Sequence, residues 1–536
     1  MIAPSESTET DSTDFDEKVG FGYFLKWKQR NRWNIHLFIA ALIATGFSCI
    51  HYLLTMLSYT HPGFALDDSW IHLQYARTIY EGTPWEYSPG YPSTGSTSPL
   101  WSTILSVLFY VSADPVNLAW CIYFISTLFY ISSTFMVGKI VSTYTENLQW
   151  GTLSVLGFVL IPRNTWLMLS GMETPLFVFI LLLSIIIMDR IELKYDLVIG
   201  VLVGLAYLSR PEGLVIALGV PVRLVIISSR GSLDRNRVAM LFVSAGLAIL
   251  VALPWILHCF NITGLPLPDT FYAKVHAPTV SEIETWNYFW LVFLIEMPFL
   301  LVGMFVGVLL VFKRMPFPWL FPTILTIMYR LSIPYISLIN NGRYLLPIFD
   351  LYFVAAIVVM GLRLEKFLTG RLRFKDGRDS HLTAIAIAFL LVIMPLIPTY
   401  VWQATNYGRA VENINDLQVN IGTWLAENTP EDAVFATHDA GALRFISNRT
   451  MIDMAGLVSP DIVHGNMTTR EKLSYLRMKG CTYIVFFNDL FRHISRLLPT
   501  QAYETVYTVT VPPEVHVVSG RSTMSVYQIY WEYTSY

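Results

Sequence analysis

The sequence predicts an α-helical polytopic membrane protein with a small α/β domain at its C-terminal end. Three observations support this fold class. Of the 536 residues, 54% are hydrophobic and only 14% are charged, whereas soluble domains carry about 25% charged residues. Apolar segments long enough to cross a bilayer recur between residues 35 and 402. The composition then changes to short β-rich and amphipathic runs.

Residues 1–33 are predicted to form a disordered tail. The first twenty or so residues are polar and acidic, and they lack the apolar core and cleavage site of a signal peptide. Four basic residues follow, Lys26, Lys28, Arg30 and Arg32. Because Lys and Arg in short flanking segments favour the cytoplasmic side, the N-terminus is predicted to be cytoplasmic.

Residues 34–402 are predicted to form the transmembrane domain. The stretch 149–170 is interrupted by Pro162 and Arg163, which both disrupt a lipid-facing helix. It is therefore predicted to form two short membrane segments, which brings the total to about 13. The other predicted segments lie near 35–59, 98–113, 115–138, 173–189, 195–209, 211–229, 238–259, 288–312, 318–339, 344–363 and 382–402.

Basic loops set the predicted orientation, because cytoplasmic loops are enriched in Lys and Arg. Loops 60–97, 260–286 and 340–343 are expected outside, together with the chain after residue 403. The protein is then a multi-pass protein of the cell or plasma membrane with a cytoplasmic N-terminus and an extracytoplasmic C-terminal domain. The basic residues that define the cytoplasmic loops are Arg230, Arg235, Arg237, Lys313, Arg314 and the run from Arg363 to Arg378.

Residues 403–536 are predicted to fold as an α/β domain outside the membrane. The β-rich runs 433–437, 482–487 and 506–511 are separated by helix-like stretches such as 411–427. Such alternation is typical of helices packed on a sheet.

Asp67 and Asp68, in the first external loop, are candidate catalytic residues. They precede an amphipathic stripe formed by Ile71, Tyr75 and Ile79, which predicts a short helix lying in the plane of the membrane interface. A carboxylate held at that boundary can accept a proton from a hydroxyl group. Either aspartate could instead cap the helix. Two adjacent carboxylates repel each other and a cap needs only one, so the second calls for another role.

Charged residues recur at the predicted outer ends of helices, at Glu173, Arg210, Lys274 and Arg343. Arg suits bidentate contacts to a lipid phosphate, and Lys acts as a point charge. Interfacial snorkelling is the stronger explanation for any one cation, and Arg210 could form a structural ion pair with Glu212. All four residues are predicted to lie at the same face of the membrane, and this common position favours a shared binding site.

His438 and Asp439 follow a predicted strand at its carboxyl end, where α/β folds bind ligands. A loop-capping role explains Asp439 equally well. The sequence shows no metal-ligand spacing and no glycine-rich phosphate loop, so no metal site is predicted. The net charge of −3 gives no support for a nucleic-acid partner.

Short motifs in a fixed order carry a family resemblance. The ordered set resembles the GT-C superfamily of integral-membrane glycosyltransferases. It is most similar to the terminal arabinofuranosyltransferases of the mycobacterial cell wall and their relatives, over roughly residues 60–460. The motifs are DD at 67–68, GSTSPLW at 95–101, GMET at 171–174, RPEG at 210–213, LPDTFYAK at 267–274, GRY at 342–344, DAGAL at 439–443 and DMAGL at 453–457.

The resemblance implies an inverting glycosyltransferase of the cell envelope. The donor would be a polyprenyl-phosphate sugar, and the acceptor an extracytoplasmic glycan, lipid or protein. The likeness places the catalytic aspartate at Asp67 or Asp68. It places the donor-phosphate site at Glu173, Arg210, Lys274 and Arg343, with Tyr272, in the motif of Lys274, and His438 as further candidates for substrate binding.

The implied reaction needs one base and one stabilised leaving group. A phosphate leaving group needs no general acid if Lys274 and Arg343 neutralise its charge. A divalent cation could join Asp67 and Asp68, but two carboxylates are an incomplete site on their own, so no cofactor is assigned.

A membrane transporter or flippase of a lipid-linked or small polar substrate is the alternative function. Transporters place ionisable groups near the bilayer midplane and often show internal repeats. Here the charges gather at one face and no repeat is evident. A third reading, a sensor whose outer domain binds a ligand, would leave Asp67 and Asp68 without a purpose.

Overall fold

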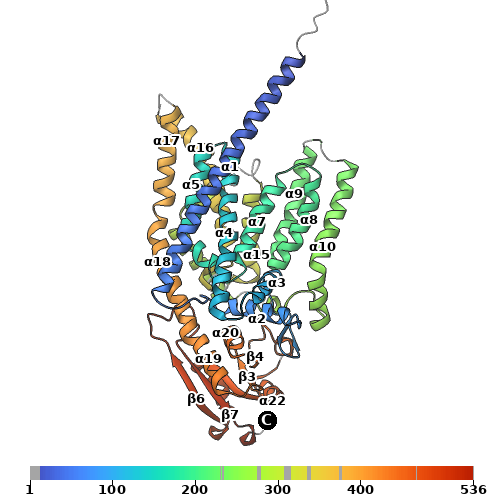
Figure 1. Cartoon of the computed structure of the whole chain (residues 1–536), viewed down its shortest axis with the longest axis vertical. Helices are drawn as coiled ribbons and strands as arrows, with labels where there is room; N and C mark the ends of the chain where they lie inside the picture. The colour runs from blue at the N-terminus through green and yellow to red at the C-terminus, as the bar shows by residue number, and fades with distance from the viewer. Residues whose placement is uncertain are drawn as a thin grey trace, which may run out of the picture.

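The computed structural model describes residues 12–229, 231, 234–274, 279–306, 316–334, 340–372, 377–465, 467–534 and 536. A bundle of apolar helices forms one end of the molecule, and an α/β unit that contains the C-terminus forms the other (Figure 1). The first external loop, which contains α2 (Asp68–Tyr80), lies between them, as does the following helix α3 (Pro99–Ser106).

The helical bundle has the composition and the surface of a membrane domain. Six of its described helices are long and apolar enough to cross a bilayer. Large apolar side chains point outward, such as Phe47 on α1 at 71% exposure and Phe242 on α10 at 75%, as a lipid-facing surface requires. The chain is therefore an integral membrane protein. The bundle helices are α1 (Ser12–Leu57), α4 (Pro115–Thr145), α5 (Leu148–Leu160), α7 (Thr174–Met188), α8 (Lys194–Ser209), α9 (Val215–Ser229), α10 (Arg235–Thr263), α12 (Val280–Glu296), α13 (Phe299–Leu301), η3 (Val302–Val306), α15 (Pro316–Ser332), α16 (Leu346–Leu372), α17 (Gly377–Ala388), η6 (Phe389–Ile393) and α18 (Leu396–Ile414).

Helix α1 begins inside the segment predicted as a disordered tail. It runs without a break from Ser12, and no proline stands between Ser12 and Trp33 to stop it. Residues 1–11 lie outside the described part of the chain.

The helix break that Pro162 and Arg163 predict within 149–170 is present in the structure. Helix α5 ends at Leu160 and α6 (Asn164–Met168) follows. The Arg163 guanidinium lies 3.3 Å from Glu296 and also contacts Asn341, so its charge is paired inside the bundle rather than exposed to lipid. With five residues, α6 is too short to cross a bilayer on its own.

Segment 98–113 does not form the single membrane-spanning helix that was predicted for it. It forms α3 (Pro99–Ser106) and η1 (Val107–Tyr110), which together reach about 18 Å at 1.5 Å per residue, short of the roughly 30 Å hydrocarbon core. The total of about 13 membrane segments stays a prediction. Parts of the predicted segments 288–312 and 318–339 lie outside the described residues, as do Arg230, Lys313, Arg314 and residues 373–376 of the basic run.

The α/β unit confirms the predicted C-terminal sheet. Its strands are β3 (Val434–Thr437), β4 (Thr450–Asp453), β5 (Cys481–Phe487), β6 (Tyr503–Thr510) and β7 (Thr523–Ile529), in the order β4-β3-β5-β7-β6. Strand β3 is parallel to β4 and β5, whereas β7 is antiparallel to β5 and β6. The crossovers between the parallel strands carry α20 (Ala442–Ser447), α21 (Pro460–His464) and α22 (Thr469–Met478).

One nearly continuous helical segment connects the bundle to the sheet. Helix α18 passes into η7 (Asn415–Val419) and then α19 (Asn420–Asn428). Leu417, Ile421 and Leu425 from this segment are buried in one core with Val485 of β5. The predicted boundary at residue 403 falls within α18, and the division into domains stays a prediction.

The first external loop packs against the α/β unit. Its helix α2 (Asp68–Tyr80) is followed by a hairpin of β1 (Glu86–Ser88) and β2 (Tyr91–Pro92). Ile71 and Tyr75 share the core of Leu417 and Val485. The apolar stripe on α2 therefore contacts protein, which corrects the expectation that it lies against lipid.

Candidate active site

The predicted site residues come from separate elements whose ends meet between the bundle and the α/β unit. Asp68 begins α2, Glu173 directly precedes α7, and Arg210 directly follows α8. Lys274 ends α11 (Asp269–Lys274), and Arg343 directly follows η5 (Asn340–Gly342). The structure brings these five residues together through the contacts described below, at the common face that the sequence indicates.

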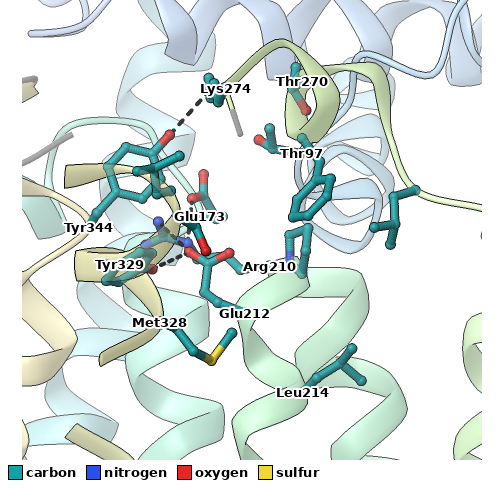
Figure 2. A pocket seen from close by; sticks show the side chains of 15 residues that line it. Thr97, Glu173, Arg210, Glu212, Leu214, Thr270, Lys274, Met328, Tyr329 and Tyr344 are labelled. Atoms are coloured by element: carbon teal, nitrogen blue, oxygen red, sulfur yellow. Dashed lines mark hydrogen bonds and ion pairs between the residues drawn. The ribbon is translucent and has the colours of Figure 1, made fainter. Parts of the chain in front are cut away.

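Three cations surround the ring of Tyr344. Arg343 donates to the Tyr344 hydroxyl at 2.7 Å, and its guanidinium lies 4.7 Å from the ring centroid. Arg210 lies 4.7 Å from the same centroid. The Lys274 ammonium donates to the Tyr344 hydroxyl at 3.2 Å (Figure 2). The electron-rich ring face attracts cations, so Tyr344 holds positive charge at one place.

Three carboxylates balance these cations, and Glu173 among them is buried. Glu173 lies 3.4 Å from Arg210, and Glu212 lies 2.8 Å from Arg210. Asp68 lies 2.9 Å from Arg343. The predicted structural ion pair of Arg210 and Glu212 is therefore present. Because Arg210 is buried and paired, its position is set before any ligand binds.

A cavity of about 290 Å³ opens beside this cluster. Charged and hydroxyl groups gather at one end, where Figure 2 shows Lys274, Tyr344, Glu173 and Arg210 close together. The cavity thus fits a ligand with an anionic head and an apolar tail. Its remaining wall is mostly apolar and includes Leu214, Leu267, Phe271, Met328 and Ile333.

Asp67 faces a different partner from Asp68. Its two carboxylate oxygens accept the backbone N–H groups of Gly441 and Ala442, each at 2.8 Å. A Cβ atom on Gly441 would lie 2.0 Å from the Asp67 carbonyl oxygen, so this approach requires glycine. Asp67 makes no side-chain cap hydrogen bond to α2, and the capping alternative is wrong for this residue.

The two aspartates have opposite electrostatic environments. Burial, together with the negative charge of Asp439, raises the pKa of Asp67 to about 8, although the N–H groups of Ala442 and Gly441 oppose the shift. Burial also acts on Asp68, but the positive charges of Arg343, Lys274 and His72 outweigh it and lower its pKa. At neutral pH Asp68 is therefore ionised, and Asp67 is poised to exchange a proton.

Solved structures of membrane glycosyltransferases share this architecture. ArnT from Cupriavidus metallidurans, bound to undecaprenyl phosphate, aligns with a TM-score of 0.57 and 10% identity over 92% of this chain and 99% of that chain. The Archaeoglobus fulgidus oligosaccharyltransferase, in complex with Zn and sulfate, aligns with a TM-score of 0.56 and 15% identity over 84% of this chain and 68% of that chain. The chain has the GT-C fold.

A further A. fulgidus structure with this fold is the oligosaccharyltransferase AglB in complex with an inhibitory peptide and a dolichol-phosphate. It aligns with a TM-score of 0.57 and 13% identity over 86% of this chain and 70% of that chain. Residues 410–530 match a family model described as a domain of unknown function (DUF8728). A search of curated proteins gives no match. The likeness to arabinofuranosyltransferases stays a prediction.

Two predicted substrate-binding residues lie away from this cavity. Tyr272 is not part of its lining, and its ring centroid lies 6.1 Å from that of His464. His438 packs against Phe486 and Phe487 at 4.8 and 4.6 Å between ring centroids. Tyr272 thus contacts a residue of the α/β unit, and His438 packs within that unit. Neither side chain contacts the cation cluster in these pairs.

The surroundings of Asp67 and Asp68 do not fit a divalent cation. Among the described residues, no group of three or more His, Cys, Asp or Glu side chains could hold a metal ion. Asp67 already accepts two N–H groups, and Asp68 pairs with a guanidinium. A hard cation needs about six oxygen ligands, which these neighbours do not supply.

The sequence analysis does not single out three residues of this candidate site. His72 lies 3.2 Å from Glu173, Tyr329 donates to Glu212, and Tyr344 organises the cations. His72 stands four residues after Asp68 on one helix, and that spacing places both side chains on one face. The same spacing rule could have identified it.

Proposed function

We propose that this chain is an inverting GT-C glycosyltransferase that moves a sugar from a polyprenyl-phosphate carrier to an extracytoplasmic glycan, lipid or protein acceptor. The observation that carries the proposal is the cavity with apolar walls and a charged end, where Lys274 and Arg210 lie beside Tyr344. A polyprenyl phosphate has this amphipathic pattern. The bound undecaprenyl phosphate of ArnT and the dolichol-phosphate of AglB support the same class of donor.

The carrier phosphate would lie at the cationic end of the cavity. Lys274 would bind it as a point charge, while Arg210 and Arg343 present guanidinium groups that suit phosphate oxygens. The isoprene chain would follow the apolar wall toward the lipid. Because the arginines are fixed by Glu173, Glu212 and Asp68, little reorganisation is needed when the donor binds.

Asp67 would act as the general base. It takes the proton of the acceptor hydroxyl while that oxygen forms a bond to the anomeric carbon of the donor sugar. The bond from that carbon to the phosphate oxygen breaks on the opposite face, which inverts the configuration. The phosphate keeps the electron pair, and Lys274 and Arg343 stabilise its charge. Asp68 stays ionised and holds Arg343, a division of roles that opposite pKa shifts favour.

The chemistry would take place on the extracytoplasmic side. The α/β unit lies at the end of the bundle that carries the cavity, whereas α1 starts beyond the opposite end (Figure 1). The basic residues around Arg30 and Arg32 favour the cytoplasm for that opposite end. Donor and acceptor would therefore meet outside, between the bundle and the α/β unit.

The direct test incubates the purified protein with a panel of polyprenyl-phosphate sugars and an acceptor fraction from the host envelope. We expect release of polyprenyl phosphate from at least one donor, and a product whose anomeric configuration, read by NMR, is inverted. Lys274→Ala should lose this activity, whereas Arg492→Ala, at a side chain 77% exposed on the α/β unit, should keep it. Consumption of no donor, or retention of configuration, would contradict the proposal.

A further inference from the structure

A second cavity, of about 280 Å³, lies between the first external loop and the α/β unit. The hairpin of β1 and β2 contributes Tyr87, Ser88 and Tyr91. The α/β unit contributes Asp461, Tyr475 and Lys479. The C-terminal part of α10 completes the lining with Asn261. Its residues are separate from those of the donor cavity, and the proposed reaction uses none of them.

The side chains in this cavity are arranged as a binding site rather than a packing gap. Tyr475 donates to Asp461 at 2.7 Å, which orients the carboxylate. The Lys479 ammonium lies 4.9 Å from the ring centroid of Tyr91 and 5.4 Å from that of Tyr475. Two rings thus hold one ammonium group in place. A site whose polar groups are held by neighbours is prepared for a specific ligand.

The chemistry of the lining matches a saccharide. Tyrosine rings offer flat faces for the C–H surface of a sugar ring. The Asp461 carboxylate, the Asn261 amide and the Lys479 ammonium offer the acceptors and donors that hydroxyl groups need. A volume of about 280 Å³ lies near the lower end of small-ligand sites, roughly 300 to 1,000 Å³, and leaves room for a sugar unit.

The cavity is connected to Asp67 by one side chain. Tyr87 lines the cavity, and its hydroxyl donates to the backbone carbonyl of Ala440. The next two residues, Gly441 and Ala442, donate their N–H groups to Asp67. Ser88 also binds the backbone of Met451 through its hydroxyl. A ligand in the cavity would therefore lie against the same junction that positions the proposed base.

We infer that this cavity binds a sugar unit of the acceptor, so that the acceptor of the transfer reaction is a glycan. The role as acceptor site rests on the proposed function, while the binding of a saccharide does not. A sugar held by Tyr91, Tyr475 and Asp461 would extend its chain past Tyr87 and present a hydroxyl group toward Asp67.

The test is binding of the full-length protein, in detergent and without donor, to an array of immobilised neutral and uronic-acid saccharides. We expect the wild-type protein to bind at least one saccharide. Tyr91→Ala and Asp461→Asn, both at accessible positions of the cavity, should weaken that binding tenfold or more. Tyr533→Ala, at a side chain 55% exposed and outside the cavity, and Lys274→Ala, in the donor cavity, should leave it unchanged.

Two results would overturn the inference. One is that the wild-type protein binds no saccharide on the array. The other is that Tyr91→Ala and Asp461→Asn bind as the wild type does and, in the transfer assay, leave the acceptor KM unchanged. If saccharide binding follows the expected pattern but no polyprenyl-phosphate sugar is consumed, the proposed function fails and the binding site stands.

Discussion

Asp67 and Asp68 are adjacent in the chain, yet their carboxylates face different partners. Asp67 binds the loop after β3, and Asp68 binds Arg343. Adjacent helical residues point in different directions, because successive positions are about 100° apart around the helix. This geometry gives two identical side chains opposite pKa shifts, which the amino-acid types alone do not indicate.

The raised pKa of Asp67 predicts an acid limb in the pH profile of transfer. A base must be ionised to act, so kcat/KM should fall tenfold per pH unit below about 8, the pKa of Asp67. Asp439→Asn removes a negative neighbour, so it should lower that pKa and move the limb to lower pH. Asp489→Asn, at a side chain 59% exposed, is the matched control. An identical limb in wild type and Asp439→Asn would argue against Asp67 as the base.

Replacing each aspartate by asparagine separates their roles. Asp67→Asn keeps an oxygen that can accept one of the two N–H groups but loses the basic oxygen, so turnover should fall by about 10² to 10⁴-fold while donor binding persists. Asp68→Asn should weaken donor binding, because Arg343 loses the carboxylate that holds it in position. Folding and donor binding are measured first, then transfer. Near wild-type transfer by both variants would make the pair structural and Glu173 the next candidate.

Lys274 offers a cleaner test of the phosphate site than Arg343. Lys274→Ala should weaken donor binding by about 1.5 to 3 kcal/mol, the range for hydrogen bonds to charged groups, in a titration with polyprenyl phosphate. Arg343→Ala would also leave Asp68 without its partner, so Arg343→Lys is the better companion because it retains the charge. Wild-type donor affinity in both variants would refute the phosphate role.

Helices are joined at the opposite end of the bundle by a second set of charges. Asp196 of α8 lies 2.8 Å from Arg223 of α9 and 3.6 Å from Arg237 of α10, and all three are buried. Arg223 also donates to the Met188 carbonyl at 2.6 Å. One carboxylate thus connects three helices that follow one another in the chain.

Removing the Asp196 carboxylate should destabilise the helical bundle without changing the donor cavity. Asp196→Asn leaves two buried guanidinium groups without their counter-charge, a loss of about 3 to 5 kcal/mol. The measurement is the denaturant midpoint of the protein in detergent. Glu192→Gln, at an exposed carboxylate just before α8, should unfold as the wild type does. A midpoint of Asp196→Asn equal to that control would show that the cluster contributes no stability.

Hydropathy alone did not predict the length of every helix. Segment 98–113 is mostly apolar and has no charged residue, yet it forms short helices with Trp101 and Leu105 buried in the protein core. A lipid-facing helix and a helix buried in protein have similar compositions, so hydropathy does not separate them. The break at Pro162 was predictable because proline acts on its own helix.

At the scale of the whole molecule, the basic N-terminal segment and the α/β unit lie at opposite ends. Cysteine labelling can therefore show which side of the membrane each end occupies. In a cysteine-free background, Thr83→Cys in the first external loop and Arg492→Cys in the α/β unit should react with a membrane-impermeant maleimide on intact cells. Asn236→Cys, in the first turn of α10, should react only after permeabilisation. All three positions are exposed, so labelling of Asn236→Cys from outside would reverse the orientation.

Composition, charge and motif order were sufficient for the polytopic membrane fold, the C-terminal sheet and a common face for Glu173, Arg210, Lys274 and Arg343. These features depend on local hydropathy and on the side of the membrane that each loop occupies. The tertiary structure alone decided that Tyr344 organises the cations, that Asp67 contacts Gly441, and that the hairpin of β1 and β2 forms a second cavity with α22. Most of those contacts join residues that are distant in the sequence, such as Asp67 and Gly441 at 374 positions, and their distances depend on how the helices and the sheet pack together.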